Sequence, residues 1–273
     1  SYVEDGTCEG ENQSDLVLSS AEVGDNGLID ADSITVLKRI EQPYRNHNGG
    51  FLVHAGNSSY LWGLGDGGSA NDPHSHGQDQ SSPLGTILLF EFRDNEVLAV
   101  LDNSTGDPYI LHSGLRNPWR FDIGNSNDLW IADVGQNCWE EVNLVSLIER
   151  ANLGWSEREG FQEFQEEMSC SSTRDDSENG LTDPLLAYPH ENGNCSITGG
   201  YWMDWGPENL RDGYLYGDFC TGSIWILEET DGKWNERHLG NSGGMIVGFG
   251  KGFNDEILVF HWAGDIVMIN GKI

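Results

Sequence analysis

The sequence predicts an all-β protein, and three features support that prediction. The 273 residues include 36 Gly and 10 Trp, and the mean hydropathy is -0.46, a composition that suits many short strands joined by tight turns. Helical periodicity is nearly absent, because the best candidate, residues 140–150, amounts to about two turns at most. Short runs of aromatic and β-branched residues recur along the chain instead.

The recurring runs share one form, in which a strand leads through a polar Gly/Asn/Asp turn to a second, mostly apolar strand. Four copies can be read, at residues 50–66, 119–133, 200–218 and 245–262. Their spacing, with long insertions between them, fits the blades of a β-propeller decorated by loops. A β-sandwich with irregular loops is the alternative.

The second strand of each copy is apolar on both faces, as stacked blades require. These strands lie near residues 61–64, 129–131, 214–216 and 257–260. Residues 1–45 show only two weak strands, near 15–20 and 33–40. We therefore predict a single propeller domain over residues 1–273 with four-stranded blades, about four of them within 46–273 and a remnant of an early blade within 1–45.

The charge of the chain excludes several classes of partner. A formal charge of -31, from 45 Asp+Glu against 14 Lys+Arg, would repel nucleic acid and anionic membranes. No apolar run approaches the roughly 18 residues that a membrane span needs. Such acidity keeps a surface hydrated in high salt, so a halophilic source is one hypothesis and an ordinary acidic secreted protein the other. The start at Ser1, with neither initiator Met nor signal peptide, predicts a mature or truncated chain.

The chain has five cysteines, and none lies in a CxxC pair of the kind that binds zinc or exchanges disulfides. Structural disulfides in an oxidising compartment are the expected use, which predicts a secreted or periplasmic protein. The odd number leaves one thiol free or paired with a partner.

Four segments together carry a family resemblance through their order and spacing. They are residues 42–50 (QPYRNHNGG), residues 63–69 (GLGDGGS) with Asp72, Pro73 and Gln78, residues 114–118 (GLRNP) leading to 133–143 (DVGQNCWEEVN), and residues 195–227 (CSITGGYW to SIWIL). A short match at 152–155 (NLGW) adds to them. The chain resembles the glucose/sorbosone dehydrogenase family, whose best-known members are soluble PQQ-dependent aldose sugar dehydrogenases.

The resemblance implies a six-bladed propeller, so the family's first blade and most of its second would be missing from this chain. Because open sheet edges aggregate, we expect the missing blades in another chain, a cleaved segment or a neighbouring protomer. A reduced four-bladed ring is the alternative.

The resemblance also assigns the chemistry. His47 matches the general base that takes the proton of the sugar's anomeric hydroxyl as hydride moves to the quinone. An imidazole suits this role because its ordinary pKa is about 6.5. Arg116 and Asn117 match residues that contact the quinone oxygens and stabilise developing negative charge. A structural histidine at a blade mouth and a structural arginine ion pair are the alternatives.

A calcium site is implied at Gly135 and Gln136, which match residues whose backbone carbonyls hold a Ca²⁺ ion that also binds PQQ. Hard oxygen ligands suit Ca²⁺. The acid-rich loop of residues 66–79 has Asp66 and Asp72 as candidate ligands of a second cation, or it is simply a solvated turn.

One departure from the family pattern counts against the cofactor. Quinoprotein members carry a Lys or Arg after the TGGYxx motif, where this chain has Asp204. Because PQQ has three carboxylates, an uncompensated like charge at contact would weaken its binding. The resemblance extends equally to the propeller of hedgehog-interacting proteins, so a non-catalytic binding or assembly module is the second hypothesis. The expected partners are accordingly an aldose or other carbohydrate, or a protein or protomer that completes the propeller.

The resemblance also bears on the disulfides. Cys195 and Cys220 flank a strand pair, and related sequences place cysteines similarly, which predicts a bond between them. Cys138 with Cys170 is a second candidate pair. Reduced, buried cysteines are the alternative.

Overall fold

The computed structural model describes residues 1–5, 14–102, 106–167, 169–171, 173–177 and 180–269. Within these ranges the regular structure is β-strands and short 3₁₀ turns, with no α-helix, as the sequence predicts. The chain divides into two compact units. Unit 1 is Ser1–Asn117 with Gly154–Ser156, and unit 2 is Pro118–Leu153 with Glu157–Ile273. Each unit is described by itself.

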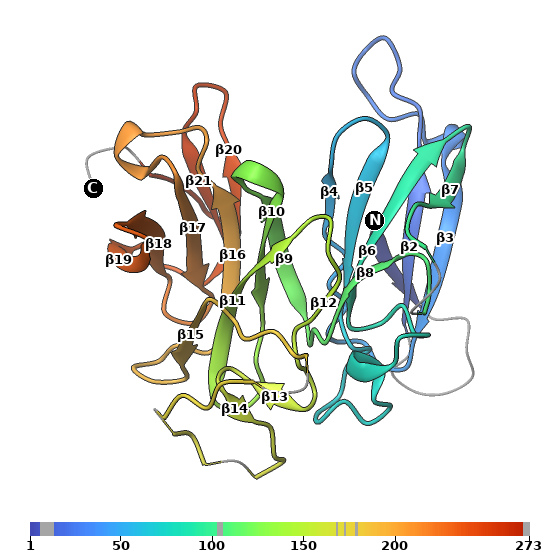
Figure 1. Ribbon diagram of the computed structural model, residues 1–273. Coiled ribbons are helices and arrows are strands. Elements are labelled where there is room, and N and C mark those ends of the chain that lie inside the picture. The colour runs from blue at the N-terminus through green and yellow to red at the C-terminus, as the bar shows by residue number, and fades with distance from the viewer. Residues whose placement is uncertain (6–13, 103–105, 168, 172, 178–179, 270–273) are drawn as a thin grey trace. The chain divides into compact units, whose positions relative to one another are not determined.

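Unit 1 begins with a three-stranded antiparallel sheet in the order β1-β2-β3 (Figure 1). Its elements are β1 (Tyr2–Asp5), β2 (Ser14–Ser20), η1 (Ala31–Ser33) and β3 (Thr35–Gln42). Strands β2 and β3 confirm the two strands expected in this segment, and β1 adds a third. The N-terminal segment thus forms a three-stranded sheet.

The second sheet of unit 1 has the order β4-β5-β6-β8, with β7 pairing on β6. Its elements are β4 (Leu52–His54), β5 (Ser59–Leu64), η2 (His76–Gln78), β6 (Thr86–Arg93), β7 (Glu96–Ala99) and β8 (Ile110–Ser113). Trp62, Leu64 and Leu88 of this sheet share one hydrophobic core with Leu16 and Ile40 of the first sheet. The two sheets therefore pack face to face.

Unit 2 contains three further antiparallel sheets (Figure 1). The first, ordered β15-β11-β10-β9, is built from β9 (Pro118–Ile123), η3 (Asn125–Asn127), β10 (Asp128–Asp133), β11 (Trp139–Ser146) and β15 (Leu186–Pro189). The second runs β16 (Ile197–Trp202), η4 (Glu208–Leu210), β17 (Gly213–Asp218), β18 (Ser223–Thr230) and β19 (Lys233–Asn241). The third is β20 (Ile246–Lys251), β21 (Ile257–His261) and β22 (Ile266–Ile269). Short strands β12 (Ala151–Asn152), β13 (Arg158–Glu159) and β14 (Gln162–Glu163) lie in the connections.

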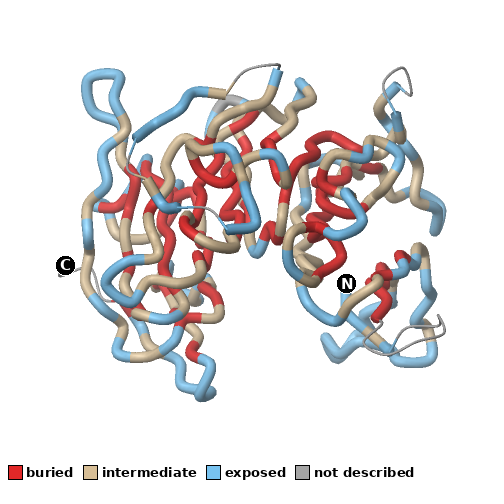
Figure 2. The backbone as a smooth tube through the Cα atoms, turned by 90° about the horizontal axis from the view of Figure 1, so that it is seen from below, coloured by how far each residue is buried: buried red, intermediate tan, exposed pale blue. Residues whose placement is uncertain are grey.

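The sheets of unit 2 also pack face to face through large side chains. Trp130 of β10 stacks on Trp202 of β16 and on Tyr214 of β17, at ring-centroid distances of 5.5 and 5.0 Å. A second core, which includes Leu215 and Phe249, joins the sheets of β17 and β20. Figure 2 colours the buried segments of the chain red. In unit 2, β17 is buried along its whole length.

The architecture is a β-propeller fold, as predicted, with a different count of blades. All four strand pairs read from the sequence are present, as β4–β5, β9–β10, β16–β17 and β20–β21. The described residues form five sheets of three or more strands, where about four blades were expected, because residues 1–42 make a sheet of their own. The first and last sheets each have three described strands, so the four-strand pattern holds for only part of the set.

Both predicted disulfides are present in unit 2. Cys138 bonds to Cys170 and Cys195 to Cys220, with Cα atoms 5.4 and 5.7 Å apart. The fifth cysteine, Cys8, lies outside the described residues. Disulfides of this kind are typical of proteins outside the cytoplasm. The described part of the chain contains no helix with the length and apolarity to cross a membrane.

Candidate functional site

His47 sits in the loop between β3 and β4, and glycines determine the shape of that loop. His47 has φ 54, in the left-handed region, and Gly49 and Gly50 follow with φ 56 and 88. A Cβ on Gly65 would lie 1.8 Å from the His47 carbonyl oxygen, so only glycine allows the two segments to approach. The backbone N–H of Gly50 donates to the Gly63 carbonyl at 2.7 Å and closes the loop on β5.

The His47 ring is held by a buried carboxylate, Asp66. Nδ1 of His47 lies 2.8 Å from Oδ1 of Asp66, whose side chain is fully buried, whereas the His47 side chain is 9% exposed. Asp66 also accepts hydrogen bonds from the Gly68 N–H at 2.9 Å and from Nε1 of Trp155 at 2.8 Å. Because a carboxylate accepts, the geometry assigns the ring proton to Nδ1 and leaves the lone pair of Nε2 available. Among the described residues, Nε2 makes no hydrogen bond.

Arg116 and Asn117 lie beside this pair in unit 1. The Arg116 carbonyl accepts from the Asp66 N–H at 2.8 Å, and its guanidinium carbon lies 5.6 Å from the ring centroid of Trp155. Oδ1 of the buried Asn117 accepts from the Gly49 N–H at 3.2 Å. Arg116 is therefore joined to Asp66 through its backbone carbonyl, and Asn117 is joined to the His47 loop through the Gly49 N–H.

In the acid-rich loop, the Asp72 carboxylate bonds the backbone of the loop itself. Oδ1 of Asp72 accepts from the His76 N–H and Oδ2 from the Gly77 N–H, both at 2.9 Å. Nδ1 of His76 contacts the Asp66 carbonyl at 2.8 Å. Within the described ranges, no group of three His, Cys, Asp or Glu residues could hold a metal ion. The second cation at Asp66 and Asp72 thus stays a prediction, and both carboxylates already have protein donors.

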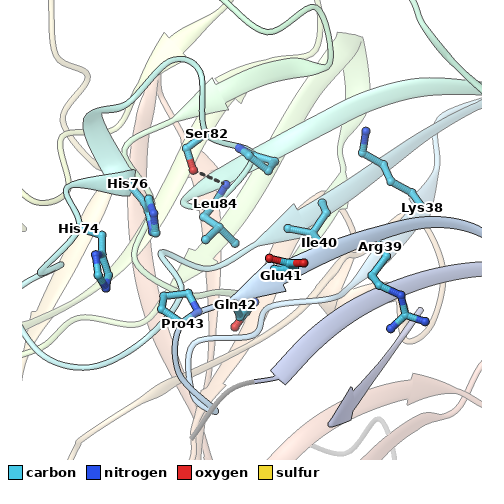
Figure 3. A pocket seen from close by; sticks show the side chains of 11 residues that line it. Lys38, Arg39, Ile40, Glu41, Gln42, Pro43, His74, His76, Ser82 and Leu84 are labelled. Carbon is cyan, nitrogen blue, oxygen red and sulfur yellow. Dashed lines mark hydrogen bonds between the residues drawn. The ribbon is translucent and has the colours of Figure 1, made fainter. Parts of the chain in front are cut away.

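A cavity of about 630 Å³ opens beside the same loop (Figure 3). His74 and His76 line one side and Lys38 and Arg39 the other, with Glu41 between them. Neither His47 nor Arg116 lines it. Its basic groups are already engaged, since Arg39 bonds Asp15 at 3.0 Å and Nζ of Lys38 lies 4.3 Å from the centroid of the Tyr109 ring.

Gly135 and Gln136, the predicted calcium residues, lie in unit 2 in the loop between β10 and β11. Oε1 of Glu159 accepts from four consecutive backbone N–H groups, those of Gln136, Asn137, Cys138 and Trp139, at 2.7, 2.7, 3.0 and 3.2 Å. The peptide bonds here are trans, so each carbonyl points opposite to the N–H of its own peptide unit. The carbonyls of Gly135 and Gln136 therefore point away from Glu159.

Further buried acids surround this loop. Burial raises the pKa of Glu140 to about 7, against the opposing effect of His190, whose Nε2 lies 2.5 Å from Oε1 of Glu140. Burial, reinforced by the charge of Asp133, raises the pKa of Glu141 to about 8. Oε1 of Glu141 accepts from the Gly160 N–H at 2.6 Å.

Asp204, the departure from the family pattern, is exposed in unit 2 just after β16. Its charge contributes to the raised pKa of Asp122, about 6, of which burial is the main cause. Arg120 is a cation on the same strand, β9, as Asp122. Its guanidinium packs against Gly248 of β20, so closely that a Cβ added to Gly248 would lie 2.8 Å from Nη2. Burial lowers the pKa of Arg120.

Several of these residues were missed from the sequence. Asp66 was assigned to a cation rather than to His47, and neither Glu159 nor Arg120 was given a role. The only available signals were that Asp66 stands inside a quoted family motif, residues 63–69, and that Arg120 lies two residues after another, residues 114–118. Glu159 lies outside the quoted motifs.

The fold is that of a β-propeller with a buried histidine–aspartate pair, and comparison with known proteins identifies the family. The family model described as "Glucose / Sorbosone dehydrogenase" matches residues 1–212, and the chain belongs to this family. It is 30% identical to the HIPL2 protein of Arabidopsis thaliana over 215 residues, which is 69% of this chain but only 30% of that protein.

Solved structures support the fold. A glucose dehydrogenase aligns with a TM-score of 0.76 at 16% identity, over 100% of this chain and 77% of that one. The PQQ-bound aldose sugar dehydrogenase of Streptomyces coelicolor aligns with a TM-score of 0.66 at 17% identity, over 93% of this chain and 72% of that one. At these identities the likeness establishes the β-propeller fold.

Proposed function

We propose that the protein is a PQQ-dependent aldose sugar dehydrogenase-like oxidoreductase with His47 as its general base. The observation that carries the proposal is the buried Asp66 carboxylate 2.8 Å from Nδ1 of His47. This contact fixes the tautomer that a base needs, with the lone pair on Nε2. A histidine with a purely structural role would have no need of a free Nε2.

In the proposed reaction, Nε2 of His47 takes the proton of the hydroxyl on C1 of the sugar. The hydrogen on C1 leaves as hydride, so the aldose becomes a lactone. PQQ, when bound, supplies the two-electron acceptor for that hydride. Asp66 stabilises the imidazolium that forms and keeps its ring in place. Arg116 provides a permanent positive charge, and its contact with the Trp155 ring holds the guanidinium in position.

The residues of unit 1 fit a quinone, because a base, a cation and an amide are held on neighbouring segments: His47 by Asp66, Arg116 at the Trp155 ring, and Asn117 at the Gly49 N–H. In unit 2, the outward carbonyls of Gly135 and Gln136 fit Ca²⁺, which prefers such oxygens. Asp204 fits poorly, because its negative charge would face a cofactor that carries three carboxylates.

The proposal extends to location and partners. Two disulfides support a secreted or periplasmic protein that takes an aldose or another carbohydrate as substrate. Residues 1–273 would form one propeller domain, and the proposed protein partner is another protein or a second protomer that adds strands to it.

A second candidate is a non-catalytic binding or assembly module. The observation in its favour is Asp204, an exposed carboxylate near Asp122 where the family's quinoproteins carry a cation. In this case, the His47–Asp66 pair would serve only to hold the loop of residues 46–50.

The test adds PQQ and Ca²⁺ to the purified protein and records the bound quinone spectrum and dye reduction with a panel of aldoses. We expect uptake at micromolar PQQ and activity that His47→Ala abolishes. His54→Ala is the matched control, because His54 is exposed on β4 of the same unit and bonds only the Asn57 carbonyl. Absence of PQQ uptake at micromolar concentration would refute the proposed PQQ-dependent enzyme and favour the non-catalytic binding or assembly module.

A further inference from the structure

The loop of residues 135–139 is organised by one side chain that no part of the proposed chemistry uses. Glu159 is 1% exposed, and its Oε1 atom accepts from four consecutive N–H groups. One oxygen with four donors bends the backbone around itself, as anions do in backbone nests. The loop therefore takes its curvature from this carboxylate.

Glu159 is itself fixed by its surroundings. It ends β13, which pairs with β14 in a short hairpin. The next residue, Gly160, donates its N–H to Glu141 at 2.6 Å, and a Cβ on it would lie 2.7 Å from Cγ of Trp139. Nε1 of Trp139 donates to Oε1 of Gln162 at 2.9 Å. Hairpin and loop are thus joined at several points, which keeps the Glu159 carboxylate in place beside the loop.

The consequence concerns the opposite side of the loop. Because the N–H groups of Gln136 and Asn137 face Glu159, the carbonyls of Gly135 and Gln136 face away from it. Without the carboxylate, each peptide unit would turn to satisfy its N–H elsewhere, and the carbonyl oxygens would turn with it. The orientation of two oxygens on one face of the loop is therefore set by one carboxylate on the other face.

We propose that Glu159 is the positioning residue that aims the Gly135 and Gln136 carbonyls at a divalent cation. The identity of the cation as Ca²⁺ rests on the proposed function, whereas the orientation of the loop rests on the hydrogen bonds alone. Residues that orient metal ligands from behind typically contribute about 10- to 100-fold to metal affinity.

The test compares the full-length protein with its E159Q variant. Alanine would leave four buried N–H groups without an acceptor, whereas glutamine keeps the shape and replaces a charged acceptor by a weaker neutral one. Two quantities are measured. The first is hydrogen exchange of the backbone amides of residues 136–139 without metal. The second is the affinity for Tb³⁺, whose binding is followed by its emission sensitised by Trp139 and whose displacement by Ca²⁺ is recorded as loss of that emission. We expect E159Q to speed exchange of these amides at least about 10-fold and to weaken Tb³⁺ binding by about 10- to 100-fold.

Asp218→Asn is the matched control. Asp218 is another fully buried carboxylate of unit 2 that accepts from backbone N–H groups, those of Cys195, Ser196 and Thr221, at 3.0, 3.1 and 2.9 Å. It should destabilise its own turn without changing exchange at residues 136–139 or Tb³⁺ affinity. A general loss of stability is thereby separated from loss of positioning.

The outcomes are distinct. Unchanged exchange of residues 136–139 in E159Q would overturn the proposal, and so would faster exchange with unchanged Tb³⁺ affinity, because the carboxylate would then be structural only. If the unaltered protein binds neither Tb³⁺ nor Ca²⁺, the calcium site of the proposed function fails. Hydrogen exchange of residues 136–139 without metal would still decide whether Glu159 fixes the orientation of the peptide units in the loop.

Discussion

Glu141 should make the protein less stable as the pH rises, and Glu141→Gln should remove that dependence. The side chain is buried, and this burial together with the neighbouring Asp133 raises its pKa to about 8 from an ordinary value of 4.5. A carboxyl with a higher pKa in the folded than in the unfolded state binds its proton more tightly when folded. It therefore favours folding at low pH, and this contribution is lost as the pH rises from about 4.5 through about 8.

The size of the effect follows from these two pKa values. Between pH 5 and pH 7, linkage predicts a loss of about 2.5 kcal/mol in the free energy of unfolding from this one group. Glu140, with a pKa of about 7, and Asp122, with a pKa of about 6, add contributions of the same sign. The unaltered protein should therefore be more stable at pH 5 than at pH 7.

The assay is urea unfolding at pH 5, 6, 7 and 8, followed by tryptophan fluorescence at constant salt, with disulfides intact. Glutamine has nearly the shape of a protonated glutamate and carries no charge. Between pH 5 and pH 7, the free energy of unfolding of Glu141→Gln should therefore fall by about 2.5 kcal/mol less than that of the unaltered protein. Glu163→Gln, an exposed position in the same unit, is the control and should follow the unaltered protein. Equal pH dependence of Glu141→Gln and the unaltered protein would refute the argument from burial.

Two further predictions concern the site. Asp66→Asn places an amide that can donate to Nδ1 of His47 and so favours the wrong tautomer. The kcat for dye-linked aldose oxidation should then fall by about 100- to 10,000-fold, with the circular dichroism spectrum unchanged. Retention of more than a tenth of the activity would contradict the role of the His47–Asp66 pair. Asp204→Arg restores the charge that the family's quinoproteins carry, so PQQ affinity measured by fluorescence titration should rise at least about 10-fold, with Asp204→Asn intermediate. Equal affinity in all three proteins would show that Asp204 does not face the cofactor.

The strand pairs could be predicted from the sequence because they are local. A turn rich in Gly, Asn and Asp between two apolar runs forms a hairpin almost regardless of its surroundings, as β4–β5 and β9–β10 show. Strands buried on both faces, such as β10 with Leu129, Trp130 and Ile131, reveal stacked sheets through their composition alone. The first sheet was underestimated, because β1 is a short strand with polar residues and only its pairing with β2 makes it recognisable.

The residues of the site were predictable only where a motif carried them. His47, Arg116 and Asn117 stand in family motifs, and the structure brings them together in unit 1. The partner of His47 was not predictable, because a carboxylate in an acid-rich loop reads equally well as a cation ligand, a solvated turn or a hydrogen-bond acceptor. The buried position of Asp66, with Trp155 as a second donor 89 residues away in sequence, decides among these.

By itself, then, the sequence determined the all-β class, the hairpins, both disulfide pairs and the family, since these depend on local patterns or on motifs in a fixed order. Only the tertiary structure decided what each buried carboxylate does: Asp66 orients a histidine, Glu159 curves a loop, and Glu141 carries a raised pKa. The physical reason is that the role of a carboxylate depends on its desolvation and on the donors around it. Both are set by segments that are distant in the chain and meet only in the folded protein.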